Sequence, residues 1–384
     1  MNLLHLSDLH IGKRVNEYSM LEDQKYILNE ILNIIHEKKV QTVLIAGDIY
    51  DKSVPPAEAV AVLDEFLTKL MDSHIEVFMI SGNHDSQERL NFGSRIMDKN
   101  GVHIAGRFQG NLCHYALKDE YGIINVYLLP FLKPAMLLPY FEEEIESYEK
   151  AIEFALSTVK IDKNQRNLLI AHQFVTNAGQ KPVQSDSENV SLGGVEEVDY
   201  KIFDDFDYVA LGHIHRSQSM GRKTVRYAGS PLKYSFSEVR HEKSVTLITW
   251  KEKENLKYEK IPLIPIRDMR QIKGKLEQLT DSKIASLANC EDYIHAILTD
   301  EEDIMDAIGK LRIIYPNIMR LDLENKKTCS QKETEMLKSD QILQQEPLKL
   351  FSEFYKNQNN INLDEIRMNI MEQLILELKE KEGE

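Results

Sequence analysis

The feature that most constrains this chain is a pattern that recurs at five places along it. At each place a short apolar run ends, and a side chain able to bind a metal ion follows at once. Runs of Val, Ile and Leu without alternation are typical of strands that are buried on both faces. Ligands collect just outside the carboxyl ends of the strands in such sheets. The pattern therefore predicts one site, spread across one sheet, at which the five strand ends meet.

The candidate site residues follow the apolar runs 2–6, 43–46, 77–80, 168–171 and 209–211. In chain order they are Asp8, His10, Asp48, Asn83, His84, Asp85, His172, His213 and His215. Asp8 and His10 are two residues apart, so both can face one ion, and His213 and His215 share that spacing. A single histidine at a strand end is usually only hydrogen-bonded, but five independent strand ends make coincidence improbable. Imidazole, amide and carboxylate donors together suit manganese, iron or zinc better than calcium.

Size and composition place the chain among globular proteins. Its 384 residues, 42% of them hydrophobic, suffice for two or three domains with a sizeable core. Three cysteines without a C-x-x-C motif are typical of reduced thiols, so we expect a cytoplasmic protein. We expect no signal peptide, because Asp8 comes too early in the chain. We expect no membrane span either, because Lys133 and three prolines interrupt the most apolar stretch, 123–141. The net charge of -15 is unfavourable for a nucleic-acid binder.

Strand and helix patterns alternate through residues 1 to about 110, which predicts a largely parallel sheet with helical cover. Helices are expected at 20–39, from Pro56 to about 70, at 88–99 and at 142–159. Residues 173–200 lack a regular pattern and predict a long loop near the site. Strand patterns resume at 225 and end near 261–265, where two prolines indicate a linker.

The rest of the chain has a different character. Strands near 293–298 and 319–323, with a helix at 301–315, predict a small α+β module. Two further helices are expected at 347–355 and 363–381, the second with an apolar stripe. Such a pair cannot bury its apolar faces alone, so it packs either on its own chain or on a partner. The domains expected are therefore 1–262, 266–326 and 346–384.

The motifs resemble those of the calcineurin-like metallophosphoesterase superfamily. The matching segments are Asp8-Leu9-His10, Gly47-Asp48, Gly82-Asn83-His84-Asp85, His172 and Gly212-His213-Ile214-His215. Segments 6–12, 46–51 and 228–238 are similar, in addition, to the SbcD branch, the bacterial nuclease subunits of SbcCD complexes. The resemblance is strong over residues 1–262. Over the rest of the chain only the expected order of helices and strands is similar. It implies an α/β sandwich of two mixed β-sheets flanked by helices, with a small α+β capping domain and a C-terminal helical pair.

The resemblance also implies roles for the site residues. Asp8, His10 and His215 would hold one divalent ion, most typically Mn²⁺, and Asn83, His172 and His213 a second, with Asp48 bridging them. His84 would stabilise developing charge or protonate the leaving oxygen. Asp51 would orient His84, although an aspartate in a turn can also simply be solvated.

The function implied is a DNA nuclease of repair and recombination, a double-strand 3′→5′ exonuclease with single-strand and hairpin endonuclease activity. The partner that the resemblance implies is an SbcC-type coiled-coil ATPase. This chain contains no G-x-x-x-x-G-K-[ST], so any dependence on ATP must come from another polypeptide. A homodimer through helices of the first domain is also implied. Lys13, Arg14 and a local excess of Lys and Arg over residues 213–243 could contact DNA phosphates or form a solvated basic face.

Two alternatives compete with that interpretation. One is another metallophosphoesterase, such as a protein phosphatase or a cyclic-nucleotide diesterase, which would not need the added module and tail helices. The other is a non-catalytic scaffold, which would have no use for a full ligand set that includes His84.

Overall fold

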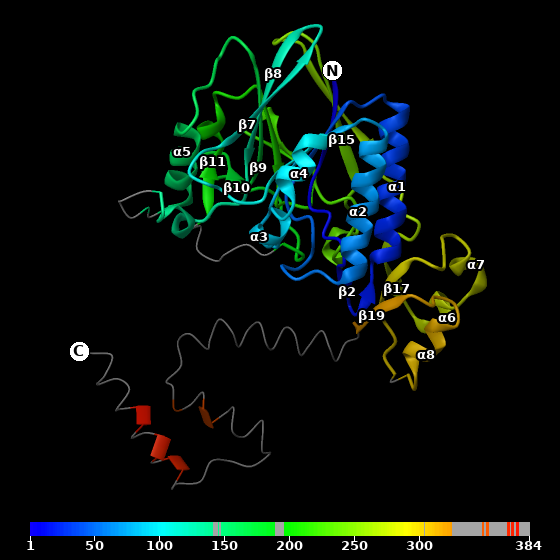
Figure 1. Cartoon of the computed structure of the whole chain (residues 1–384). Helices are drawn as coiled ribbons and strands as arrows, with labels where there is room; N and C mark the ends of the chain where they lie inside the picture. Colours follow the sequence, from blue (N-terminus) through cyan, green and yellow to red (C-terminus); the bar gives the residue numbers. More distant parts are fainter. Residues whose placement is uncertain are drawn as a thin grey trace.

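Two six-stranded mixed β-sheets pack against each other in the computed structural model of the chain, and helices cover their outer faces (Figure 1). The structure describes residues 1–140, 145, 147–188, 196–302 and 304–324, together with residues 348, 351–352, 367–368, 370–371 and 374–375. This arrangement confirms the predicted α/β sandwich. It also corrects one expectation, because the five strand ends belong to two sheets and not to one.

The first sheet has the strand order β16-β15-β1-β4-β5-β6. Its strands are β1 (Asn2–Leu6), β4 (Thr42–Ala46), β5 (Glu76–Ile80), β6 (Val102–Ala105), β15 (Ser244–Trp250) and β16 (Leu256–Pro262). The four strands from β1 to β6 are parallel, as the alternation of strands and helices predicted, whereas β15 and β16 add antiparallel pairs at the edge. Helices α1 (Leu21–Glu37) and α2 (Ala57–Asp72) cover its outer face.

The second sheet has the order β13-β14-β12-β9-β8-β7. Its strands are β7 (Cys113–Asp119), β8 (Gly122–Leu129), β9 (Arg166–His172), β12 (Tyr208–Gly212), β13 (Gln218–Met220) and β14 (Arg222–Tyr227). Strands β8, β9, β12 and β14 are parallel. Helix α5 (Tyr148–Ser157), which begins at the side-chain cap of Ser147, covers the outer face.

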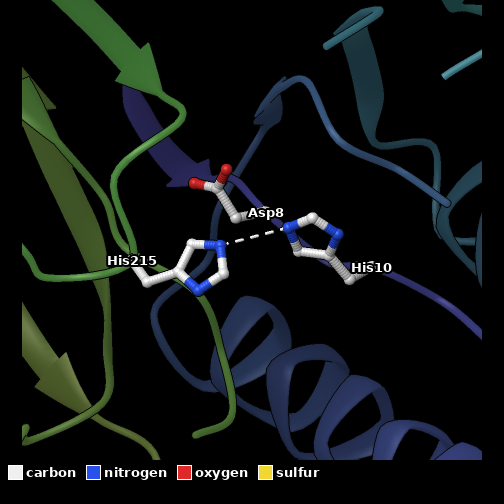
Figure 2. A group of neighbouring side chains, drawn as sticks. All are labelled: Asp8, His10 and His215. Atoms are coloured by element: carbon white, nitrogen blue, oxygen red, sulfur yellow. Dashed lines mark hydrogen bonds between the residues drawn. The ribbon is translucent and has the colours of Figure 1, made fainter. Parts of the chain in front are cut away.

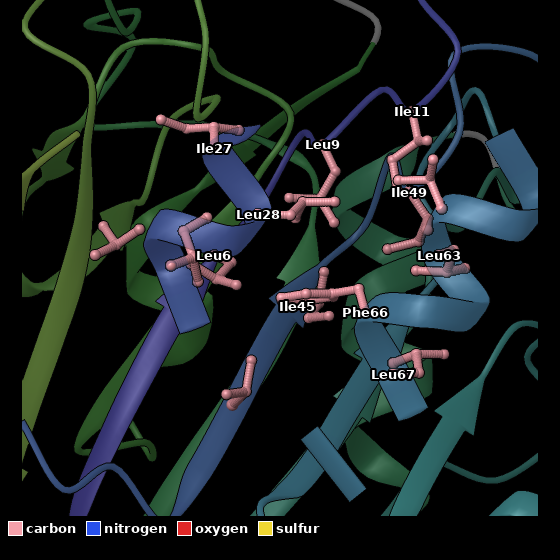
Figure 3. Packing of buried hydrophobic residues seen from close by; sticks show 14 of the residues in the cluster. Leu6, Leu9, Ile11, Ile27, Leu28, Ile45, Ile49, Leu63, Phe66 and Leu67 are labelled. Atoms are coloured by element: carbon pink, nitrogen blue, oxygen red, sulfur yellow. The ribbon is translucent and has the colours of Figure 1, made fainter. Parts of the chain in front are cut away.

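Three apolar clusters hold the sandwich together. Between the sheets, fully buried residues such as Leu44, Phe78 and Ile170 meet across the gap. Figure 3 shows the cluster outside the first sheet, where Leu6 and Ile45 lie against residues of α1 and α2. Each such side chain contributes about 1.5–3 kcal/mol by leaving water, so the two sheets form a stable frame for the loops at their ends.

A separate three-stranded parallel sheet forms the small module. It contains β17 (Met269–Gly274), β18 (Tyr293–Leu298) and β19 (Ile318–Leu323), with helices α6 (Leu276–Leu279), α7 (Ser282–Ala285) and α8 (Ala307–Arg312). The buried carboxylate of Asp23 on α1 joins it to the sandwich, accepting hydrogen bonds from Arg267 at 2.8 and 3.0 Å and from the Tyr293 hydroxyl at 2.7 Å. The boundaries expected at 262 and 266 fall between β16 and β17.

The remaining elements are short. They are β2 (Arg14–Val15), β3 (Tyr18–Ser19), β10 (Phe174–Thr176), β11 (Glu197–Asp199), α3 (Gln87–Leu90), α4 (Ser94–Met97) and the 3-10 turns Asp98–Asn100, Pro134–Leu137, Tyr200–Phe203 and Phe236–Glu238. The single helix predicted at 88–99 is wrong, because Gly93 adopts a left-handed φ of 74° and separates α3 from α4. Pro56 caps α2 in an extended conformation and is not its first helical residue.

Two further expectations concern a membrane span and the C-terminal helices. In the described part of the chain, no helix is long and apolar enough to cross a membrane. The terminal helix pair expected at 347–355 and 363–381 lies largely outside the described residues.

Candidate metal centre

The carboxyl ends of β1, β4 and β5 in one sheet meet those of β9 and β12 in the other. The ring of His172 crosses between the sheets and donates a hydrogen bond from Nδ1 to the carbonyl of Ala46 at 2.8 Å. Glycines make this approach possible: a Cβ on Gly212 would lie 1.8 Å from the Ala46 carbonyl, and one on Gly82 would lie 2.1 Å from Asp48 Oδ1. The side chains that follow these strands therefore converge between the two sheets.

The backbone at these strand ends is unusual. Four of the candidate residues have positive φ although they are not glycine, namely Asp8 (52°), His10 (44°), Asp48 (48°) and His213 (103°). L-residues adopt this region rarely and at a cost, and such residues cluster at functional sites. Each strand turns sharply there, so its polar side chain enters the space between the sheets.

Asp8, His10 and His215 form the first group of possible ligands (Figure 2). All three are at most 2% exposed, and their ligand atoms lie within 4.8 Å of one another. The Nε2 atoms of His10 and His215 face each other at 3.1 Å. Ligand atoms on one ion lie about 3.0–3.4 Å apart when metal–nitrogen bonds are about 2.1 Å long. The group therefore has the spacing of a cation site.

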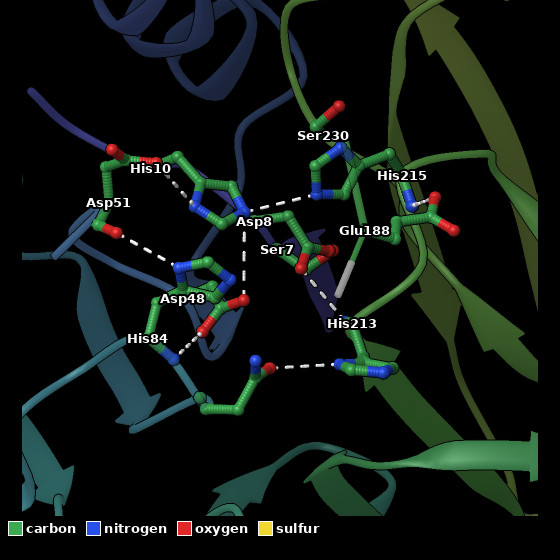
Figure 4. A network of polar contacts seen from close by, with 12 residues as sticks. Ser7, Asp8, His10, Asp48, Asp51, His84, Glu188, His213, His215 and Ser230 are labelled. Atoms are coloured by element: carbon green, nitrogen blue, oxygen red, sulfur yellow. Dashed lines mark hydrogen bonds and ion pairs between the residues drawn. The ribbon is translucent and has the colours of Figure 1, made fainter. Parts of the chain in front are cut away.

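A second group lies beside the first. The side-chain oxygen of Asn83 is 3.0 Å from His172 Nε2 and 3.0 Å from His213 Nδ1. Figure 4 shows the carboxylate of Asp48 facing the ring of His10. Oδ2 of Asp48 lies 3.4 Å from His172 Nε2 and 3.7 Å from His10 Nε2, so one carboxylate oxygen faces both groups. The structure thus brings together all seven residues that the sequence singled out as ligands.

The electrostatics of the site favour bound cations. Burial lowers the pKa of His213 to about 3 and holds the pKa of His10 well below its usual value, so both rings are neutral. Burial also opposes protonation of His172, but the Asp48 carboxylate outweighs it and raises the pKa of His172 to about 9. The field of Asp48 therefore stabilises positive charge at this place.

The chemistry of the donors also matches such cations. Neutral imidazoles, an amide oxygen and carboxylates are donors that suit divalent transition metals, so the residues present fit a pair of such ions.

A network behind His215 could not be anticipated from the sequence motifs. His215 Nδ1 lies 2.8 Å from the Ser187 hydroxyl and 3.3 Å from Glu238, and the His215 amide donates to Glu188 at 2.7 Å. The buried ammonium of Lys243 in turn donates to Glu238 and to the His215 carbonyl. Residues that orient a ligand in this way strongly affect metal affinity. The only signal was that the loop 173–200 was expected near the site.

Asp85 ties two of the strand ends together. Its buried carboxylate accepts hydrogen bonds from the amides of Ile49, Tyr50 and Gly82 at 2.8–3.1 Å. Burial and the nearby Asp48 charge raise the pKa of Asp85 to about 6 despite these bonds. Asp85 therefore holds the loop after β4 against the loop after β5, and so fixes Asp48 relative to Asn83.

The structure places Asp51 differently from the expectation that its acid orients His84. His84 donates from Nδ1 to the backbone carbonyl of Asp51 at 3.0 Å. The Asp51 carboxylate instead pairs with Lys13 at 2.6 Å and lies 3.6 Å from His10 Nδ1. The contact to His84 therefore does not depend on the side chain at position 51. The half-buried His84 still offers a ring nitrogen within 4.8 Å of ligand atoms of His10 and Asp48.

Most of the basic residues near the site are engaged elsewhere. Lys243 is buried against Glu238, Lys233 pairs with Asp268, Arg222 binds backbone carbonyls, and Arg226 is buried over a tyrosine ring. Of the seven Lys and Arg residues between 213 and 243, Arg216, Lys223 and Arg240 are exposed. The candidate DNA-contacting surface is therefore smaller than the local charge excess suggested.

Comparisons with known proteins identify the family to which the chain is similar. The sequence profile of the calcineurin-like phosphoesterase family matches residues 1–217, and that of the type 5 capsule protein repressor C-terminal domain matches residues 265–359. The chain is 34% identical over 390 residues to the SbcD subunit of the nuclease SbcCD from Staphylococcus epidermidis, with 100% of both chains covered.

Two solved structures are more distant. A dimetal phosphatase from Danio rerio has 14% identity and a TM-score of 0.41, with 69% of this chain and 98% of that chain covered. The phosphopantetheinyl hydrolase of Mycobacterium tuberculosis has 14% identity and a TM-score of 0.37, with 62% and 92% covered.

The position of Asp48 between the two groups leads to a prediction. Asp48→Ala should weaken Mn²⁺ binding by well over tenfold, because even residues that only orient ligands cost about 10–100-fold when removed. Calorimetric titration of the EDTA-treated protein with Mn²⁺ would measure this. Asp64→Ala, which removes an exposed carboxylate from α2, should leave binding unchanged. Unaltered affinity and stoichiometry in Asp48→Ala would contradict the site as described.

Proposed function

The chain belongs to the calcineurin-like phosphoesterase family and is a metallophosphoesterase nuclease. We propose that its substrate is DNA. In this proposal it is a double-strand 3′→5′ exonuclease and a single-strand and hairpin endonuclease that acts in DNA repair and recombination. The full-length similarity to the nuclease component of an SbcCD complex supports this more than any other single observation. We propose that it acts in the cytoplasm, as expected from its reduced cysteines.

The family fold implies two divalent ions, and we propose which residues hold them. Asp8, His10 and His215 hold one ion, Asn83, His172 and His213 hold the other, and Asp48 bridges both. The contacts between His10 and His215 and those of Asn83 with His172 and His213, with Asp48 Oδ2 facing both sets, support this assignment. We propose Mn²⁺ as the ion, because the mixture of imidazole, amide and carboxylate donors suits it.

Different residues of the chain then have different roles in hydrolysis. When bound, two divalent ions polarise a phosphodiester and lower the pKa of water, which makes a nucleophile available at neutral pH. Glu238 and Ser187 orient the His215 ring, and Asp85 fixes the loops that carry Asp48 and Asn83. His84, held through Nδ1 by the Asp51 carbonyl, stabilises charge or gives a proton to the leaving oxygen.

The two alternative functions remain distinguishable by activity. A phosphatase would hydrolyse p-nitrophenyl phosphate in preference to DNA, and a non-catalytic scaffold would hydrolyse neither. The proposed nuclease should degrade duplex DNA in a metal-dependent manner and be inactive after EDTA treatment.

The partner that we propose is an SbcC-type coiled-coil ATPase. The name of the full-length relative describes one component of a complex, and the sequence of this chain contains no G-x-x-x-x-G-K-[ST] motif for binding ATP. The proposed contact is the C-terminal segment 346–384, whose apolar positions Ile366, Ile370, Leu374 and Leu378 recur every four residues. In this division, residues 1–262 form the nuclease domain and 266–326 a domain that caps the DNA.

We also propose a homodimer through the helices that follow β5. Phe92, between α3 and α4, and Ile96, in α4, are 85% and 72% exposed and line the same surface pocket. Large exposed apolar side chains that lie together mark interaction surfaces. Phe92→Asp with Ile96→Asp should convert a dimer to a monomer in sedimentation experiments, since two charges would have to be desolvated in the contact. Ile264→Asp, at an equally exposed apolar residue elsewhere, is the control. A dimer that survives the double substitution would place the interface elsewhere.

Substitution of His84 tests whether this residue binds metal or assists catalysis. His84→Ala should reduce kcat on duplex DNA by about 10²-fold or more, the scale of a lost general acid, while both ions stay bound. Metal content should be measured on the same samples. Asp51→Ala should retain more activity than His84→Ala, because the carbonyl that holds His84 is still present. If metal content falls in parallel with the rate, His84 is a ligand.

The tail is proposed to serve association and not chemistry. A chain ending at Asn325 should still cut short DNA with Mn²⁺, because all proposed site residues precede it. It should fail to co-purify with the ATPase and lose any dependence on ATP, whereas the full chain should show both. Unchanged affinity of the shortened chain for the ATPase would show that the tail packs on its own domain.

A further inference from the structure

The space between the two sheets changes from apolar to polar at one end. Along β15, Val245 and Leu247 belong to the cluster under α1 and α2, whereas Ile248 and Trp250 belong to the cluster between the sheets. Side chains alternate along a strand, so Ser244 and Thr246 continue the inner row. Both are at most 7% exposed, and neither hydroxyl has a partner among the described residues. Hydroxyls thus replace aliphatic groups at this end of the core.

A cavity of about 290 Å³ opens at this polar end, behind the His215 backbone. Ser244 lines it, as does Ser217, whose buried hydroxyl also lacks a partner in the described chain. Its charged lining consists of Arg216, Arg240, Lys243, Lys260 and Glu242. Lys243 is already neutralised by Glu238, which leaves three cations against one carboxylate. The three cations form no ion pair within the described residues, so the wall carries uncompensated positive charge.

A buried arginine lies on β14, two residues before Ala228, which lines this cavity. Val225 and Tyr227 of β14 face the outer cluster, so Arg226 faces the gap between the sheets, as does Ala228, which lines the cavity. Arg226 is 4% exposed, stacks over the Tyr258 ring at 4.1 Å and has no carboxylate partner in the described part of the chain. Its Nε is buried without a hydrogen bond. Buried charges are normally paired, so this region lacks an anion.

We propose that the cavity binds a small phosphate-bearing anion, either inorganic phosphate or a phosphomonoester. Arg216, Arg240 and Lys260 would supply charge-assisted hydrogen bonds, and the hydroxyls of Ser244 and Ser217 would supply neutral ones. The volume lies at the lower end of the range for small-molecule sites, which suits an anion no larger than a mononucleotide. The site contains none of the proposed metal ligands except His215, whose ring nitrogens are engaged elsewhere.

The test uses the full chain after EDTA treatment, so that phosphate held by metal ions does not contribute. Calorimetric titration with inorganic phosphate, in chloride buffer at constant ionic strength, should show saturable binding of one anion per chain. Arg240→Ala with Lys260→Ala should weaken that binding at least about tenfold, and Ser244→Ala should weaken it less. Lys257→Ala is the matched control, because Lys257 is exposed on the same strand but pairs with Thr249, on the opposite side of the sheet.

The outcomes distinguish phosphate binding in the cavity from a cavity that holds only water, from unspecific charge attraction and from a path for DNA. They also test this proposal independently of the nuclease assignment. An absence of saturable phosphate binding would mean that the cavity holds only water, and an equal loss of affinity in Lys257→Ala would mean unspecific charge attraction. Either result overturns the proposal.

A deoxynucleoside 5′-monophosphate and an oligonucleotide without terminal phosphate are the further probes. Binding of the oligonucleotide alone, with the same dependence on Arg240 and Lys260, would make the cavity part of a DNA path and also overturn it. Mn²⁺-dependent cleavage of DNA is measured separately, so failure of one assignment leaves the other intact.

Discussion

The close approach of the two sheets at their carboxyl ends is the constraint on which the rest of this structure depends. Ala46 and Gly212 meet backbone to backbone, at a distance that no Cβ on residue 212 would allow. Because of this contact, the ring of His172 can reach the carbonyl of Ala46, and ligands from both sheets enter one space. A sandwich with ordinary spacing between its sheets, about 10 Å, would hold the two groups of side chains apart.

Hydrogen bonds from loops then fix what the sheets bring together. Asp85 joins the loops after β4 and β5, whereas Ser187, Glu188 and Glu238 position His215 from the opposite side. Such contacts matter because a metal site is sensitive to shifts of a few tenths of an ångström in its ligands. The rigid core and the polar loops therefore have separate tasks, the first setting the overall distance and the second the orientation of individual rings.

The sequence predicted the regular part of this arrangement and little of the irregular part. Strand ends could be recognised because apolar runs stop abruptly at residues such as Asp8 and His172. The antiparallel edge strands and the contacts of Ser187 could not, since each depends on which segments lie side by side in space. The same holds for Asp51, where the contact comes from the backbone carbonyl, an atom that every residue possesses. Basic residues such as Lys243 looked available to DNA only because their burial is a tertiary property.

The left-handed backbone affects how much folded protein accumulates in the cell. It occurs at Asp8, His10, Asp48 and His213. Each such residue costs about 1–3 kcal/mol, which is comparable in sum to the whole stability of many domains. Ions that bind only the folded chain offset this cost by mass action. A chain synthesised while divalent metals are scarce would thus spend more time unfolded and be degraded faster. Metal supply would then govern how much of the nuclease accumulates, and not only how fast each molecule works.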